Sequence, residues 1–361
     1  MTTYRITFTP SEPYFFGNEK TFRFPDTNIA GQLDNPYFIR SESLPAQTTL
    51  FGAIRYLLLN DRDSAFESYP ENYEQRIGKD SFRITDTKPQ SFGIINGISP
   101  VFLHYRCTAA APKSNAPLPE EGIYVKTPLD HRYGEAVYTP FRRALLTENG
   151  ECPKREYAED YDAKKGLSGS YMNIGTGKTV EAYDIFRTVT RVGISKKQSD
   201  DAFFKKEFCM LSAGWSFGIY LTLNTNSGET PQLDPVVFLG QNKSAFLIEC
   251  VPEENRIAEA VCALLQPNTV YCLGDTYLSS SVYQKFTFAV TLTRDHRTYE
   301  TVSDKNNPHR RIRKGSTLHK LIRAGSVFWL DPTQLSEEET AENFSHPNAA
   351  TVGMNQIIIK K

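Results

Sequence analysis

Three stretches of the chain alternate apolar and polar residues, which is the pattern of a β-strand that buries one face. They are residues 4–8, 215–223 and 286–292. Pro10 and Pro13 end the first stretch, because proline cannot donate a backbone hydrogen bond inside a sheet. The sequence therefore predicts one strand close to the N-terminus and two strands in the second half of the chain.

Helical spacing marks two further segments. In residues 43–59 the side chains of Leu50, Ile54 and Leu57 share one helical face, behind Pro45 and two threonine cap candidates. Residues 256–265 carry a shorter amphipathic pattern. We expect a long helix at the first place and a short helix at the second.

The order strand, loop, helix, strand recurs in both halves of this chain of 361 residues, a length that favours two domains. It predicts an α+β fold of two ferredoxin-like (RRM-like) domains with long loop or hairpin insertions, although periodicity alone also allows other α+β arrangements. The predicted domains are residues 1–210 and residues 211–361. We expect residues 112–119 and 148–171 to be exposed excursions, because they carry too little apolar surface to offset the entropy of ordering.

Composition limits which cellular compartment and which binding partners we expect. A formal net charge of -1 gives no overall attraction to polyanions, so any nucleic-acid contact must come from local clusters of Lys and Arg. The 6 cysteines are scattered without a C-x-x-C pair, which indicates buried thiols in a reducing compartment. The N-terminus lacks the apolar core of a secretory signal and no apolar run is long enough for a membrane span, so we expect a cytoplasmic protein with no membrane partner.

The sequence contains no recognisable catalytic, metal-binding or cofactor-binding pattern. Residues 175–179, GTGKT, look like the end of a phosphate-binding P-loop, but Met172 stands where that motif needs its first glycine, so a glycine turn is the better interpretation. The histidines lack metal-ligand spacing. His104 and His131 lie beside arginine or tyrosine and could orient a phosphate or act as a general acid, although an ordinary surface or interfacial histidine is more common. We expect no catalysis, no metal and no cofactor.

Basic residues gather near the C-terminus. Residues 305–323 contain no acidic residue, so they carry a strong local positive field in a nearly neutral chain. RNA is one natural partner for this stretch, and a solvated or protein-facing loop is an equally good interpretation. The RNA contacts predicted here are Arg310, Arg311, Arg313 and Lys314.

A second basic cluster lies within residues 186–208, where cations are interleaved with phenylalanines. Lys and Arg can take the phosphates of single-stranded RNA while aromatic rings stack on its bases, and the alternative is that the rings belong to the core. A third, smaller site is the glycine turn at residues 240–246, where an ammonium and backbone amides could meet a phosphate. The predicted phosphate contacts are Arg191, Lys196, Lys197 and Lys243, with Gly52 and Gly193 allowing close approach of the backbone.

Five segments, in order along the chain, carry a resemblance to a known family. They are an aromatic pair and polar turn after the first strand, a helix of the pattern PSxTLxGALR, an R-x-G-I segment, a basic glycine loop and an A-G-S-x-F strand. The loop has one glycine, Gly240, where the family usually has several. The segments are residues 6–22, 43–59, 191–211, 237–246 and 323–329. Together they resemble the repeat-associated mysterious protein (RAMP) superfamily of CRISPR systems, and within it the type III-B (Cmr complex) subunit that caps the 5′ tag of the guide RNA (crRNA).

The resemblance implies a non-catalytic RNA-binding subunit. It implies that the chain holds the crRNA 5′ tag and bridges the large polymerase-like subunit to the backbone RAMP subunit in antiviral RNA-targeting defence, meeting target RNA only indirectly. Three alternatives stay open: a RAMP-family endoribonuclease that processes precursor crRNA, the equivalent capping subunit of a type III-A complex, and a scaffold whose basic run faces an acidic protein partner.

Overall fold

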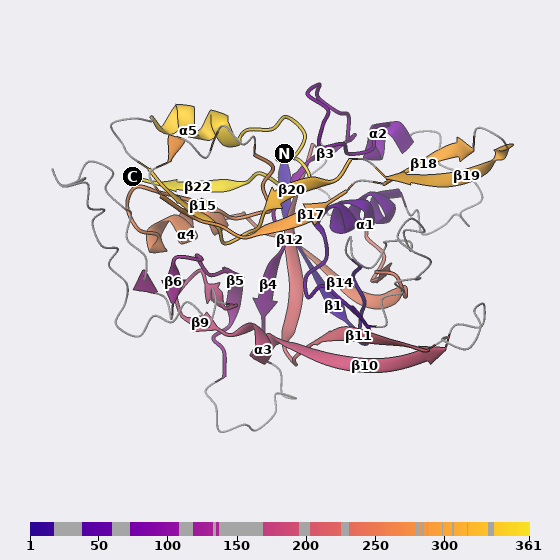
Figure 1. Cartoon of the computed structure of the whole chain (residues 1–361), viewed down its shortest axis with the longest axis horizontal. Coiled ribbons are helices and arrows are strands. Elements are labelled where there is room, and N and C mark those ends of the chain that lie inside the picture. Colours follow the sequence, from indigo (N-terminus) through magenta and orange to yellow (C-terminus); the bar gives the residue numbers. More distant parts are fainter. Residues whose placement is uncertain are drawn as a thin grey trace, which may run out of the picture.

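The computed structural model of the protein has an α+β fold, built mostly of sheets with a few helices (Figure 1). The predicted class is confirmed, and the number of ferredoxin-like units stays a prediction. The excursions predicted at residues 112–119 and 148–171 lie largely outside the described residues. The structure describes residues 1–17, 38–59, 73–107, 118–132, 135–136, 169–194, 203–224, 231–278, 282, 285–286, 288–297, 299–304, 307–315, 317–330 and 336–361.

The main sheet is 9-stranded, and its described pairs are antiparallel. β1 (Thr2–Pro10) lies between β12 (Trp215–Leu223) and β14 (Ser244–Pro252). The strands predicted at residues 4–8 and 215–223 are thereby confirmed, and they pair with each other. The other strands of this sheet are β3 (Ile95–Ile98), β4 (Phe102–Tyr105), β5 (Gly122–Lys126), β8 (Tyr171–Asn173), β9 (Thr179–Val180) and β13 (Val236–Leu239).

Strands from both sides of the predicted domain boundary share this sheet. β12, β13 and β14 all follow residue 210, while β1, β4 and β5 precede it. Residues 1–210 and 211–361 are therefore joined by one hydrogen-bonded layer, and their independence as folding units stays a prediction.

The long predicted helix is confirmed, although it starts at Gln47. Its apolar face, with Leu50 and Ile54, is buried in the same cluster as Tyr4 and Phe8 of β1. Burial of a large aliphatic side chain contributes roughly 1.5–3 kcal/mol, so this face fixes the helix on the sheet. The described helices are α1 (Gln47–Leu59), α2 (Tyr73–Ile77), α3 (Ala182–Ile185), α4 (Ile257–Leu264) and α5 (Glu337–Phe344).

A second, 4-stranded sheet lies between α4 and α5, in the order β16 (Phe288–Val290), β21 (Val327–Trp329), β15 (Thr269–Cys272) and β22 (Ile357–Lys360). Alternate residues of a strand face opposite sides of a sheet. Tyr271 of β15 packs with Ile257 of α4 and with Phe102 of the main sheet, whereas its neighbour Val270 packs with Phe344 of α5. One face of this sheet therefore rests on the main sheet, and α4 confirms the short helix predicted at residues 256–265.

The third predicted strand is shorter than expected. Among the described residues of 286–292, Phe288–Val290 form a strand, and the chain then leaves this sheet to pair β17 (Thr293–His296) with β20 (His319–Ile322). A hairpin of β18 (Tyr299–Asp304) and β19 (Asn307–Gly315) extends away from the rest, at the right of Figure 1. The remaining strands are β2 (Phe38–Arg40), β6 (His131–Arg132), β7 (Glu135–Ala136), β10 (Phe186–Ile194) and β11 (Phe203–Leu211).

The described cysteines carry free thiols. Cys209 and Cys272 are buried as predicted, whereas Cys250 and Cys262 are half-buried and Cys107, which follows β4, is exposed. Cys152 lies outside the described residues. Among the helices of the described segments, none combines the length and the apolar character that a bilayer crossing requires.

Gly218 tests the packing of the main sheet. It pairs with Phe102 on the neighbouring strand, and a Cβ added to it would lie 2.1 Å from the Phe102 ring. We expect Gly218→Ala to lower the free energy of unfolding in urea by about 1–3 kcal/mol, because the crowded ring must shift. The matched control is Gly52→Ala in α1, where a Cβ would meet nothing within 4 Å. This control should raise the stability by about 0.5–1 kcal/mol, and equal effects of the two substitutions would contradict the described packing.

Candidate nucleic-acid interface

A pair of cations lies on the ribbon that crosses the lower part of Figure 1, where β10 pairs with β11. Arg191 of β10 stands opposite Lys206 of β11 in the register. The Arg191 guanidinium carbon lies 4.8 Å from the centroid of the Phe208 ring, and the Lys206 ammonium lies 3.9 Å from the centroid of the Phe15 ring. Both cations are thus held over aromatic rings, an arrangement that is favourable because the faces of such rings are electron-rich.

The turn between β13 and β14 completes this site. Lys206 donates hydrogen bonds to Gln241 Oε1 at 3.1 Å and Asn242 Oδ1 at 2.9 Å. The turn is sharp, with a φ of 78° at Gly240 and 53° at Lys243, and a Cβ at Gly240 would lie 2.4 Å from the Phe15 carbonyl oxygen. Glycine is needed there because only its backbone fits this approach. We call Phe15, Arg191, Lys206, Phe208 and residues 240–243 the turn cluster.

The structure therefore brings together two of the predicted sites, at Arg191 and at Lys243. Lys206 was part of the basic run in the sequence but was not predicted as a contact. The alternation of FFKKEF contained the signal, because residues two apart share a face and place Lys206 on the side of Phe208.

The turn cluster carries positive charge. Within the described part of the chain, neither Arg191 nor Lys206 forms an ion pair with a carboxylate. Glu207 faces the other side of β11, where its carboxylate lies 3.6 Å from Arg40 Nε. Burial lowers the pKa of Lys206, because a half-buried ammonium loses hydration. An anion placed here would regain that lost stabilisation.

The aromatic rings of the turn cluster are buried in the hydrophobic core. Phe15 is 0% exposed and Phe208 is 3% exposed. Stacking on an unpaired base requires an open ring face, and these faces carry Lys206 and Arg191 instead. The second interpretation of the aromatic run, that its rings belong to the core, therefore fits Phe208.

The predicted contacts on β19 lie apart from the turn cluster. Residues 310–314 belong to β19, and the hairpin of β18 and β19 extends from a different part of the molecule in Figure 1. In that hairpin Lys314 stands opposite Glu300 in the backbone register. Gly193 lies on β10 and Gly52 on the exposed side of α1. Lys196 and Lys197 lie outside the described residues; Arg310, Arg311, Arg313 and Lys314 are placed by backbone alone.

The GTGKT segment is a hairpin turn between β8 and β9, as the glycine-turn interpretation predicts. The amides of Gly175 and Thr176 donate to Asn173 Oδ1, and the Lys178 ammonium pairs with the Glu120 carboxylate. The donors that a P-loop would direct at a phosphate are therefore already used by protein acceptors, Asn173 within the hairpin and Glu120 before β5.

Both histidines weighed as an acid or base have lowered pKa values. Burial, with Arg5 and Arg106 nearby, lowers the pKa of His104 to about 4. Burial alone lowers the pKa of His131 to about 4, and this side chain is 3% exposed. In the described segments, no group of three His, Cys, Asp or Glu side chains is arranged to hold a metal ion.

Comparison with known proteins gives one family and several distant structures. None of the curated proteins matches the chain. A structure described as the type III-B Cmr-beta bound to cognate target RNA shares 10% identity, with a TM-score of 0.47 over 98% of this chain and 96% of that chain. A second such structure, also with AMPPnP, has 10% identity and a TM-score of 0.41 over 90% and 86%. A Csm3-Csm4 subcomplex of the type III-A interference complex has 11% identity and a TM-score of 0.36 over 91% and 93%.

The family match carries the assignment. The model described as CRISPR-associated protein (Cas_Cmr3) matches residues 6–361, which is nearly the whole chain. It confirms the resemblance to a Cmr-type RAMP subunit that the ordered segments of the sequence indicate, and it supports a place for this chain in a type III CRISPR effector. The chain therefore belongs to the Cas_Cmr3 family of CRISPR-associated proteins.

Proposed function

We propose that this chain is a non-catalytic, RNA-holding subunit of a type III-B CRISPR effector complex, and that the turn cluster binds phosphates of the crRNA 5′ tag. Its partners would be crRNA, the large polymerase-like subunit and the backbone RAMP subunit, with target RNA met only indirectly. The observation that carries the proposal is the pair Arg191 and Lys206, which share one face of a ribbon without a carboxylate partner in the described structure.

The geometry suits a ribose-phosphate backbone more than a base. Arg191 and Lys206 are fixed over buried rings, so they lose little freedom when they bind an anion. Lys243, on the sharp turn beside Lys206, offers a further ammonium, while the amides of Gln241 and Lys243 already donate to the carbonyls of Phe15 and Gly240. A charge-assisted hydrogen bond to phosphate is roughly twice as strong as a neutral one, and phosphate contacts hold an RNA without reading its sequence. Such a site fits an RNA end that is common to many guides.

The salt dependence of RNA binding tests the turn cluster. Arg191→Gln and Lys206→Gln should each lower the magnitude of the slope of log K against log salt by about 0.7, because each removes one phosphate contact to a single strand. The measurement is fluorescence anisotropy of a labelled crRNA that carries the 5′ tag. Lys79→Gln is the control, since Lys79 is exposed and lies away from this ribbon. Slopes equal to that of the unchanged protein in both variants would remove the turn cluster from the RNA path.

The endoribonuclease alternative makes a different prediction. At neutral pH an imidazole with a pKa of about 4 is a neutral and weak base, poorly matched to proton transfer. We therefore expect the purified protein to leave precursor crRNA intact in metal-free buffer, on a denaturing gel, with His104→Asn indistinguishable from the unchanged chain. Cleavage by the unchanged chain that disappears in His104→Asn would replace the proposal by the enzymatic alternative.

A further inference from the structure

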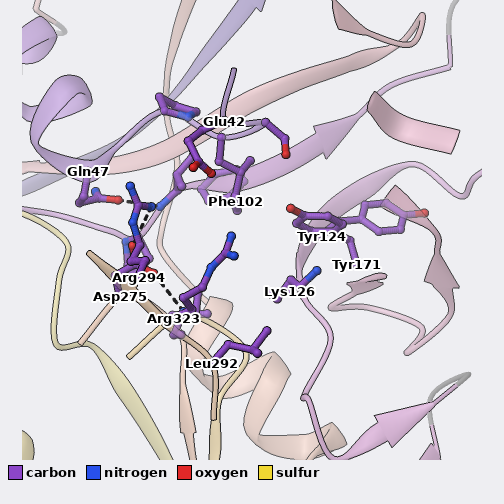
Figure 2. A pocket seen from close by; sticks show the side chains of 18 of the residues that line it. Glu42, Gln47, Phe102, Tyr124, Lys126, Tyr171, Asp275, Leu292, Arg294 and Arg323 are labelled. Carbon is purple, nitrogen blue, oxygen red and sulfur yellow. Dashed lines mark hydrogen bonds and ion pairs between the residues drawn. The ribbon is translucent and has the colours of Figure 1, made fainter. Parts of the chain in front are cut away.

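A second basic site lies in a cavity between the main sheet and the turn that follows β20 (Figure 2). The cavity has a volume of about 260 Å³. Its walls come from segments far apart in the sequence: Lys126 ends β5, Tyr171 begins β8, Arg294 lies on β17 and Arg323 follows β20. A single buried water needs roughly 10–15 Å³ of such space, so the cavity can take a small organic ligand.

Two cations of the cavity have no carboxylate partner among the described residues. The half-buried Lys126 ammonium lies 4.6 Å from the centroid of the Tyr171 ring, and Arg323, an exposed residue, lines the same cavity. Burial and the Arg323 guanidinium lower the pKa of Lys126 to about 8, and Glu181 opposes them at longer range. By contrast, Arg294 is neutralised by Asp275, with 3.1 Å between NH1 and Oδ2.

Backbone contacts hold the two cations near each other. Gly325 packs so tightly that an added Cβ would lie 2.7 Å from Lys126 Cγ, and its carbonyl accepts a hydrogen bond from the Leu129 amide at 2.8 Å. The Arg323 amide donates to the Leu292 carbonyl at 2.8 Å. Two like charges placed together by rigid backbone repel each other, and an anion between them removes that cost.

We propose that this cavity binds one nucleoside monophosphate unit, with its phosphate between Lys126 and Arg323. The chemistry of the walls supports a nucleotide over a bare phosphate. Tyr124 and Tyr171 lie near Lys126 in Figure 2, and their ring edges, with Phe102 and the exposed Leu292, give the cavity apolar wall for a sugar or the edge of a base. Glu42 lies beside Phe102 in the upper part of Figure 2, away from Lys126, and its carboxylate would repel a phosphate and so favours one orientation of the ligand.

The nucleoside monophosphate unit can be a free nucleotide or one nucleotide of a bound RNA. The same cavity variants test both of these sources. Titration calorimetry of the full chain with AMP, with adenosine and with inorganic phosphate measures the first source. We expect AMP to bind more tightly than either part alone, and Lys126→Met or Arg323→Gln to weaken AMP about tenfold or more, the effect of losing a charge-assisted hydrogen bond. Lys88→Met, at an exposed position outside the cavity, is the matched control and should change nothing.

Anisotropy of a labelled short single-stranded RNA measures the second source. A loss of RNA affinity in Lys126→Met and Arg323→Gln, without AMP binding by the unchanged chain, assigns the cavity to a nucleotide of RNA. Arg323 is exposed, so its variant should keep the melting temperature of the unchanged protein and report on binding even if Lys126→Met is unstable. Unchanged affinities for both AMP and RNA in Arg323→Gln and Lys126→Met would overturn the proposal.

The cavity and the turn cluster are tested independently. Arg191→Gln and Lys206→Gln leave every cavity residue in place, so AMP binding in these variants should match that of the unchanged chain. Failure of the salt-slope test therefore leaves the cavity proposal standing, and failure of the AMP and RNA tests with cavity variants leaves the turn cluster standing.

Discussion

Burial of β12 on both faces is the constraint on which the rest of this structure depends. Phe217, Ile219 and Leu221 lie in the core cluster that includes α1, whereas Tyr220, on the opposite face, lies in the cluster that includes α4 and the second sheet. A strand sandwiched in this way cannot move without disturbing both cores. It also explains Gly218, since the Phe102 ring fills the space beside that residue. The cavity of Lys126 and Arg323 exists because two layers meet along this strand and its neighbours.

Local periodicity was sufficient to predict the elements that are long and one-sided. The helix face of Leu50 and Ile54 and the strand at residues 4–8 follow from spacing alone, because burial of one face dictates that spacing. The same rule assigned one buried face to residues 215–223, but there Ser216, Gly218 and Tyr220 on the other side are buried as well. An alternating pattern predicts that one face of a strand is buried. It does not show whether another layer of the fold will also cover the opposite face of that strand.

The sites were harder to predict because they join distant segments. The sequence pointed to Arg191 and Lys243 separately, but their proximity depends on Lys206 and Phe15 meeting the turn at residues 240–243. Lys126 carried no signal at all, because it is one lysine at the end of a short strand. Arg323 lay in a basic run for which RNA contact and a solvated or protein-facing loop were equally good interpretations, and it was not among the predicted contacts. A run of basic residues can be recognised in the sequence. A single half-buried cation forms a site only when the fold brings it next to residues from other segments.

The carboxylates of the chain explain how a protein of net charge -1 can still present positive sites. Several lie beside the basic sites, each already engaged with a neighbouring cation: Glu207 with Arg40, Asp275 with Arg294, and Glu120 with Lys178. These pairs remove cations and carboxylates together, so they leave the local field to Arg191, Lys206, Lys126 and Arg323. Exposed pairs of this kind contribute little to stability, and their larger effect is on the field that an approaching polyanion meets. Cations that pair with a neighbouring carboxylate therefore add little to the field around this protein. The cations without such a partner are the ones that form the proposed binding sites.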